Sequence, residues 1–128
     1  MNANSILETM NRQQVDYLLI GGMNFLLRHR GALTYDVDLW IDDTDENRAR
    51  CEAALAELQA EWADSDEVWG PVANLRPGWL ERKGVFCINS PHGALDIFRT
   101  VTSLGKWSDS AASAAWEQTG QGTNYRGL

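Results

Sequence analysis

Cysteine is scarce in this chain, and long apolar runs are missing from it. Its 128 residues include two cysteines, Cys51 and Cys87, which form no CxxC pair. A CxxC metal motif is therefore excluded, and two buried free thiols are favoured over the alternative of a disulfide. No apolar run approaches the roughly 20 residues that span a bilayer, and the polar N-terminus lacks a signal-peptide pattern. We therefore expect a cytoplasmic protein without a membrane segment.

Basic residues are also few. The chain has 11 lysines and arginines against 18 acidic residues, which gives a net charge of −7. The acidity is concentrated in residues 42–67, which hold ten acids and two bases. This segment is expected to be a solvated helix face, with a surface for a basic partner as the alternative. Because duplex binding depends on neutralising phosphates, we expect no tight binding to duplex nucleic acid, whereas one nucleotide or an RNA end is compatible with this composition.

The spacing of apolar and capping residues predicts helices and strands in alternation. Ser5 and Glu8 match a capping box with Ser5 as the N-cap, and Asp43 is expected to cap a later helix with Glu46 in its first turn. The helices are expected at 6–13, 23–28, after Asp43 and at 110–118, and the strands at 17–20, 36–41, 85–89 and 94–101.

Residues 90–93, with the sequence Ser-Pro-His-Gly, are expected to join the last two strands as a hairpin. Residues 63–77 are irregular in pattern, and the tail 119–128 is rich in glycine and polar residues. No internal repeat or linker divides the chain, so residues 1–128 are expected to form a single domain. A strand–helix–strand start followed by a hairpin predicts an α+β fold, with a mixed β-sheet and helices packed on it.

Three aspartates lie between apolar neighbours on expected strands. Asp36 and Asp38 share one face of a strand, because side chains alternate with period two, and Asp96 lies on a later strand. Two close carboxylates repel each other and lose hydration, so the fold gains nothing from them. The three can converge if their strands are adjacent, and three carboxylates at one point suit Mg²⁺ with substrate phosphates as its remaining ligands. A structural arrangement with arginines or a calcium site is the alternative.

Gly21 and Gly22 stand between the strand at 17–20 and the expected helix. Glycine at such a junction lets the backbone approach a phosphate without a Cβ clash. The start of the following helix, near Asn24, would offer unpaired N–H groups and the positive end of the helix dipole. Two glycines alone are equally typical of a tight turn, so this motif gains its meaning from the three aspartates.

The string YLLIGGMNFLLRHRGALTYDVDLWID resembles the core of the nucleotidyltransferase superfamily related to DNA polymerase beta. It is most similar to the minimal nucleotidyltransferases of bacteria and archaea, which include toxin–antitoxin members. The family pattern is an apolar strand, G[GS], a short helix, [DE]x[DE] on the next strand and a third acid on a later strand. The resemblance covers roughly residues 5–107 and implies a nucleotidyltransferase-like core. It further implies Mg²⁺ binding and catalysis by Asp36, Asp38 and Asp96, and NTP triphosphate contacts by Gly21, Gly22 and Asn24.

Two features depart from the family pattern. Gly22 stands where a serine hydroxyl frequently helps to hold phosphate. Many members continue into a helical segment after the core strands, whereas this sequence ends at Leu128. The domain is therefore expected to lack a C-terminal helical extension, and either a partner chain supplies that part or the site is incomplete.

Basic residues near the motif are weaker candidates. Arg28, with His29 and Arg30, precedes the DxD strand and is a candidate for phosphate contact, although cations are also favoured at a helix C-terminus. Arg99 and Lys106 follow Asp96 and would line the same cleft, or else they are ordinary surface charges. The six tryptophans are expected in the core or at an interface rather than as a base-stacking platform.

Two functions from different classes follow. The first is an Mg²⁺-dependent nucleotidyltransferase that moves a nucleoside monophosphate from an NTP to a hydroxyl on a protein, a small molecule or an RNA end. The second is a non-catalytic interaction protein with the same core, which pairs with a toxin–antitoxin partner or with itself as a dimer.

Overall fold

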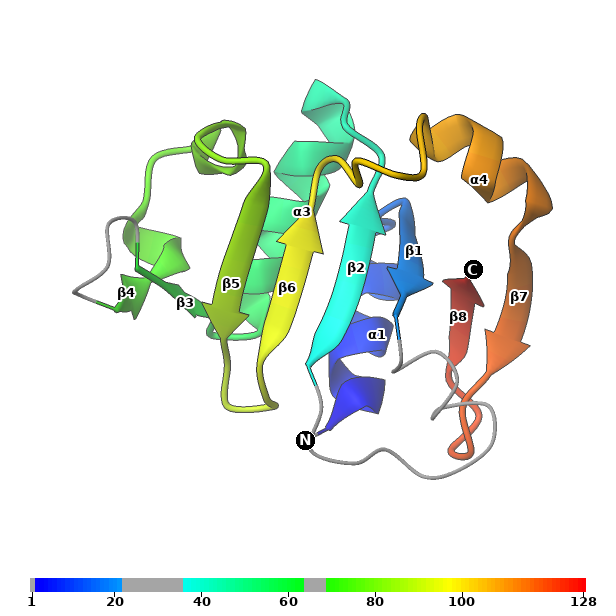
Figure 1. Cartoon of the computed structure of the whole chain (residues 1–128). Helices are drawn as coiled ribbons and strands as arrows, with labels where there is room; N and C mark the ends of the chain where they lie inside the picture. The colour runs from blue at the N-terminus through cyan, green and yellow to red at the C-terminus, as the bar shows by residue number, and fades with distance from the viewer. Residues whose placement is uncertain (1, 22–35, 64–68) are drawn as a thin grey trace.

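The computed structural model describes residues 2–21, 36–63 and 69–128 (Figure 1). These residues form a mixed α+β structure around an eight-stranded sheet with the order β4-β3-β5-β6-β2-β1-β8-β7. The helices are α1 (Ala3–Arg12), α3 (Asp45–Glu57) and α4 (Trp107–Ser113), with short 3-10 turns η1 (Val72–Asn74) and η2 (Trp79–Glu81). The strands are β1 (Tyr17–Ile20), β2 (Val37–Ile41), β3 (Glu61–Trp62), β4 (Gly70–Pro71), β5 (Val85–Asn89), β6 (Leu95–Phe98), β7 (Ala115–Gln118) and β8 (Asn124–Gly127). The expected mixed sheet with packed helices is thus confirmed.

The centre of the sheet consists of strands from both halves of the chain. β2 pairs antiparallel with β1 and parallel with β6, while β5 and β6 form an antiparallel hairpin. β8 pairs parallel with β1 and antiparallel with β7. The strand that carries two of the predicted aspartates is therefore central, with neighbours on both sides.

The main hydrophobic core lies on the face of the sheet covered by α1 and α3 (Figure 1). Alternation sends Val37, Leu39 and Ile41 of β2 into this core, where they are fully buried. In the same core, beside β3 and β5, three aromatic rings pack against one another with centroids 4.9–5.5 Å apart. They belong to Trp62, Trp79 and Phe86. These contacts leave the opposite face of β2 and β6 for Asp38, Trp40, Asp96 and Phe98.

The described residues cover part of that opposite face. Leu18, Trp40 and Ala111 form a small buried cluster, against which Trp107 and neighbouring apolar residues pack. The Trp107 Nε1–H donates to the Trp40 carbonyl oxygen at 2.8 Å, which fixes α4 on β2. The aspartate end of the same face lies beyond this cluster.

Both predicted N-caps were wrong. α1 is capped by Asn2, whose side-chain oxygen accepts from the Ser5 N–H at 3.1 Å, so Ser5 lies within the helix. α3 is capped by Thr44, whose hydroxyl oxygen accepts from the Asn47 N–H at 3.2 Å. Asn2 and Thr44 both belong to the residue types whose side-chain oxygen favours the N-cap position.

The C-terminal part differs most from expectation. The helix expected at 110–118 is α4, which starts earlier and ends at Ser113, and Ala115–Gln118 is strand β7. Asn124–Gly127 in the polar tail is strand β8, with Tyr125 fully buried. β8 pairs with β1 and β7 pairs with β8, and these pairings place both segments in the sheet although most of their residues have little strand propensity.

Other expectations fared better. Strands 17–20 and 85–89 are confirmed at their expected bounds, while those at 36–41 and 94–101 shorten to β2 and β6. The hairpin loop is confirmed, since Ser90 and Gly93 exchange backbone hydrogen bonds. Both cysteines are free thiols, but Cys87 is exposed rather than buried. The expected helix at 23–28 and its end at Gly31 lie outside the described residues, and no described helix is long and apolar enough to cross a membrane.

Candidate active site

Asp38 and Asp96 are register partners on adjacent parallel strands, β2 and β6. Their side chains therefore share one face of the sheet, the face opposite to α1 and α3. Asp36 comes one residue before β2 and is exposed, and its charge acts on both of the other carboxyl groups. Residues that are 58 positions apart in the sequence are thus brought together.

Asp38 occupies surroundings that disfavour its charge. Burial, together with the negative charges of Asp96 and Asp36, raises its pKa to about 6. Its Oδ1 atom is buried and has no hydrogen-bond partner among the residues that the structure describes. A buried acceptor without a donor is costly, and such an atom is well suited to a cation.

Cys87 of strand β5 lies next to Asp96. It is the register partner of Asp96 across the β5–β6 hairpin, and its thiol hydrogen-bonds with the Asp96 carboxyl group. Burial raises the pKa of Asp96, and Asp36 adds to this, while the hydrogen bonds with Cys87 and Asp38 oppose it. The pKa of Cys87 is itself raised by burial and by Asp96, so the thiol stays protonated as a donor.

The sequence interpretation missed Cys87, although the hairpin contained the signal. With Ser90 to Gly93 as the connection, residues 88 and 95 face each other, and so do residues 87 and 96. Counting outward from the predicted turn would have placed the thiol beside the aspartate.

Gly21 lies beside Asp38 on the side of β1, whereas Asp96 lies on the side of β6. It directly follows β1, whose Ile20 is the register partner of Asp38. Its φ of +78° lies in the left-handed region, and a Cβ at this position would come within 3.1 Å of the Asp38 Oδ2 atom. Glycine is therefore required here by both backbone conformation and the carboxylate. Gly21 therefore lies next to the carboxylate of Asp38.

The carboxylate oxygens of these aspartates are of the chemical type that binds a divalent cation. Among the described residues, no three His, Cys, Asp or Glu side chains are already arranged as a group that could hold a metal ion. Asp38 and Asp96 instead hydrogen-bond with each other, so a shared proton reduces their repulsion. A cation would do the same while also reaching the unpartnered Oδ1 of Asp38. We conclude that Asp38 and Asp96 fit Mg²⁺, with Asp36 as the more exposed third carboxylate.

The remaining predicted residues are placed less favourably, or not at all. Gly22, Asn24 and Arg28 lie outside the described residues. Lys106 is exposed and directly precedes α4, and its charge is not among those that shift the pKa of Asp38 or Asp96.

Arg99 binds Asp43 and two backbone carbonyl groups. Its guanidinium donates to both carboxylate oxygens of Asp43, at 2.9 and 3.1 Å, and to the carbonyl oxygens of Glu81 and Lys83. It thereby ties the end of β6 to the start of α3.

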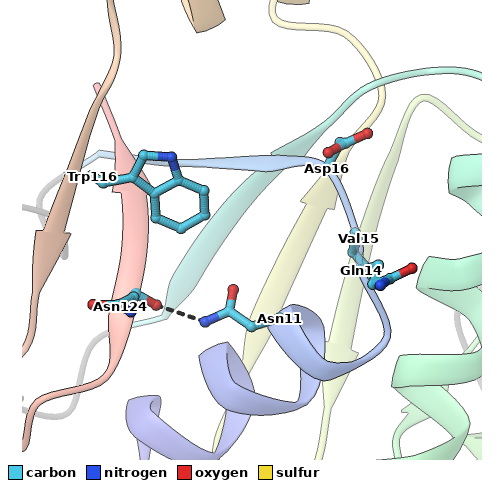
Figure 2. A pocket seen from close by; sticks show the side chains of 6 residues that line it. All are labelled: Asn11, Gln14, Val15, Asp16, Trp116 and Asn124. Carbon is cyan, nitrogen blue, oxygen red and sulfur yellow. Dashed lines mark hydrogen bonds between the residues drawn. The ribbon is translucent and has the colours of Figure 1, made fainter.

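Two surface hollows lie elsewhere on the molecule. One, of about 300 Å³, is bordered by α1 residues, the start of β1, Trp116 and Asn124 (Figure 2). The other, of about 530 Å³, runs along β7 from Trp116 to Gln118 and Asn124. Neither hollow is lined by Asp36, Asp38 or Asp96.

No protein-family model, curated protein or solved structure significantly matches this chain.

Proposed function

We propose that this protein is an Mg²⁺-dependent nucleotidyltransferase with its active site at Asp36, Asp38 and Asp96. The observation that carries the proposal is the register of Asp38 with Asp96 on adjacent strands, beside a buried carboxylate oxygen without a donor. Two raised pKa values at one point are characteristic of functional sites, because a fold gains no stability from them. Gly21 fits this proposal as the residue that leaves room beside Asp38.

Each acidic residue would have its own role. Asp36 and Asp38 would hold Mg²⁺ together with Asp96, and the bound ion would neutralise phosphate charge and favour in-line attack. Asp96 would take the proton of the acceptor hydroxyl, a role that suits a carboxylate with a raised pKa. The acceptor oxygen would form a bond to the α-phosphorus while the bond to the pyrophosphate leaving group breaks. The transferred proton would reside on Asp96 until solvent removes it.

The acceptor would approach from the exposed face of β5 and β6, where Val85 and Cys87 are exposed. A hydroxyl on a protein side chain, a small hydroxylated molecule or an RNA end meets this requirement. The net charge of −7 disfavours a long duplex as the acceptor.

The test is calorimetric titration of the full chain with a non-hydrolysable NTP, with and without Mg²⁺. We expect binding that requires Mg²⁺ in the wild type and weakens about 10-fold or more in Asp38→Asn and Asp96→Asn. Transfer from a labelled NTP to candidate acceptors should fall in the same variants. Far-UV circular dichroism confirms that both variants are folded.

Glu61→Gln is the matched control, because it removes one exposed acid from β3 of the same sheet. It should bind as the wild type does. Equal Mg²⁺-dependent binding by the wild type, Asp38→Asn and Asp96→Asn would show that the site has been assigned to the wrong residues.

A further inference from the structure

Strand β7 forms one edge of the sheet. Its inner side pairs with β8 from Ala115 to Gln118, and within the described ranges no other strand pairs with it. Unpaired edges of this kind present rows of N–H and C=O groups to other chains.

The hairpin between β7 and β8 determines which groups point outward. The Thr119 N–H donates to the Thr123 carbonyl oxygen and the Gly122 N–H to the Thr119 carbonyl oxygen, both at 2.9 Å. Gly122 has a φ of +86°, as expected for a three-residue loop with a bulge. Because inward and outward backbone groups alternate from Thr119, those of Glu117 face β8, and those of Trp116 and Gln118 face outward.

The two edges of the sheet differ in their protection. The β4 edge has two residues, one of which is Pro71 without an N–H, and it lies beside Glu61 in the acidic segment 42–67. Residues 106–128, which include β7, hold two acids and two bases and are neutral. β7 also contains no proline or lysine, the residues that commonly block an edge. Two copies of a chain with a net charge of −7 can thus approach through β7 without strong repulsion.

Trp116 adds an apolar contact at this edge. Its side chain is 62% exposed, although tryptophan is rarely so accessible in a monomer. Figure 2 shows the indole beside the hollow between β8 and the end of α1, where solvent reaches it.

We propose that β7 pairs antiparallel with β7 of a second copy, so that two sheets join across a two-fold axis. The register that fits places Trp116 opposite Trp116 of the second copy, with reciprocal hydrogen bonds between their outward N–H and C=O groups. Glu117 then faces Ala115 of the second copy, whereas a register shift of two residues would place Glu117 opposite itself. The short β4 edge adds no further copies, so the assembly closes as a dimer. This inference is independent of the transferase proposal.

The test is sedimentation equilibrium of the full chain over a range of micromolar concentrations. We expect a wild-type mass of about 29 kDa, twice the 14.3 kDa of one chain. Trp116→Lys and Gln118→Pro should each weaken association about 10-fold or more. The proline removes an N–H that points outward, so it leaves the backbone hydrogen bonds between β7 and β8 in place, while the side-chain hydrogen bond from Gln118 to Asn124 is lost.

Leu104→Lys is the matched control, because Leu104 is 41% exposed in a turn outside β7. It should associate as the wild type does. A monomeric wild type, a dimer that tolerates both edge variants, or oligomers that grow without limit would each overturn the proposal. If Gln118→Pro unfolds by circular dichroism, the result for Trp116→Lys decides.

Discussion

Asp38 is a residue whose charge the fold tolerates at a cost. Its carboxyl group is partly removed from water, and the ionisable groups that raise its pKa are also acids. Ordinary structural aspartates accept hydrogen bonds from donors, as Asp43 does from Arg99. The chemical role that we propose for Asp38 would account for this contrast.

We predict that Asp38→Asn stabilises the metal-free protein. The folded-state pKa of about 6 lies above the unfolded value near 3.8, so wild-type stability falls as pH rises through this window. In EDTA at pH 7.5, the free energy of unfolding of the variant should exceed that of the wild type by about 1 kcal/mol, after allowance for solvent screening. The difference should vanish below pH 4, where both side chains are neutral. Urea denaturation across this pH range measures it, and equal stability at pH 7.5 would contradict the prediction.

Gly21 and Gly105 allow backbone strain to be separated from contact with Asp38. Both have positive φ, at +78° and +72°, but a Cβ on Gly105 would meet nothing within 4 Å. Each alanine variant should lose about 1–2 kcal/mol of unfolding free energy. Only Gly21→Ala should also weaken Mg²⁺-dependent NTP binding, because its methyl group displaces the Asp38 carboxylate. Equal NTP binding by the two variants would refute the role given to Gly21.

At the scale of elements, an ionic cluster joins β6 to the start of α3. Asp43 binds Arg99 and, at 2.5 Å, the nearly buried guanidinium of Arg48, which also contacts Asp45. Burial alone would raise the pKa of Asp43, but its hydrogen bonds with Arg99 and Arg48 outweigh burial and lower it. The position that the sequence predicted as a helix cap therefore works as a cross-link between elements.

We predict that Asp43→Asn costs about 2 kcal/mol of unfolding free energy at pH 7, because Arg48 and Arg99 both lose a carboxylate partner. Since the folded-state pKa is lowered, this stabilisation is present above the unfolded value near 3.8 and is lost as pH falls below it. Denaturation at pH 7 and pH 3 measures the change. Arg12→Ala breaks the exposed ion pair with Glu57 and should lower the free energy of unfolding by less than about 0.5 kcal/mol. Similar losses in the two variants would contradict this account.

At the scale of the whole molecule, cation binding is linked to folding. An ion that binds only the folded chain stabilises it by RT ln(1 + [L]/Kd), about 1.4 kcal/mol at tenfold Kd. The wild type should therefore gain roughly 3–6 °C in Tm with Mg²⁺, relative to Na⁺ at equal ionic strength. Asp38→Asn should gain less than half of this. A similar shift in both proteins would mean that Mg²⁺ acts through the general surface charge.

The sequence predicted the middle of the molecule better than its end. Tyr17–Ile20 and Val85–Asn89 are unbroken or alternating apolar strands that turn residues delimit, so local pattern was sufficient. Ala115–Gln118 and Asn124–Gly127 lack that pattern, and their place depends on β1 and on each other. Their strand structure was therefore not predictable from local residues.

The three aspartates and the period-two spacing of Asp36 and Asp38 were determined by the sequence alone, because alternation along a strand is a local property. The neighbourhood of Asp38 and Asp96 was decided only by the tertiary structure, since a parallel pairing of β2 with β6 joins segments with no local contact. The same pairing removed Asp38 from water and placed Cys87 beside Asp96. Charge and burial act through space, so only the folded chain determines which carboxylates share a site.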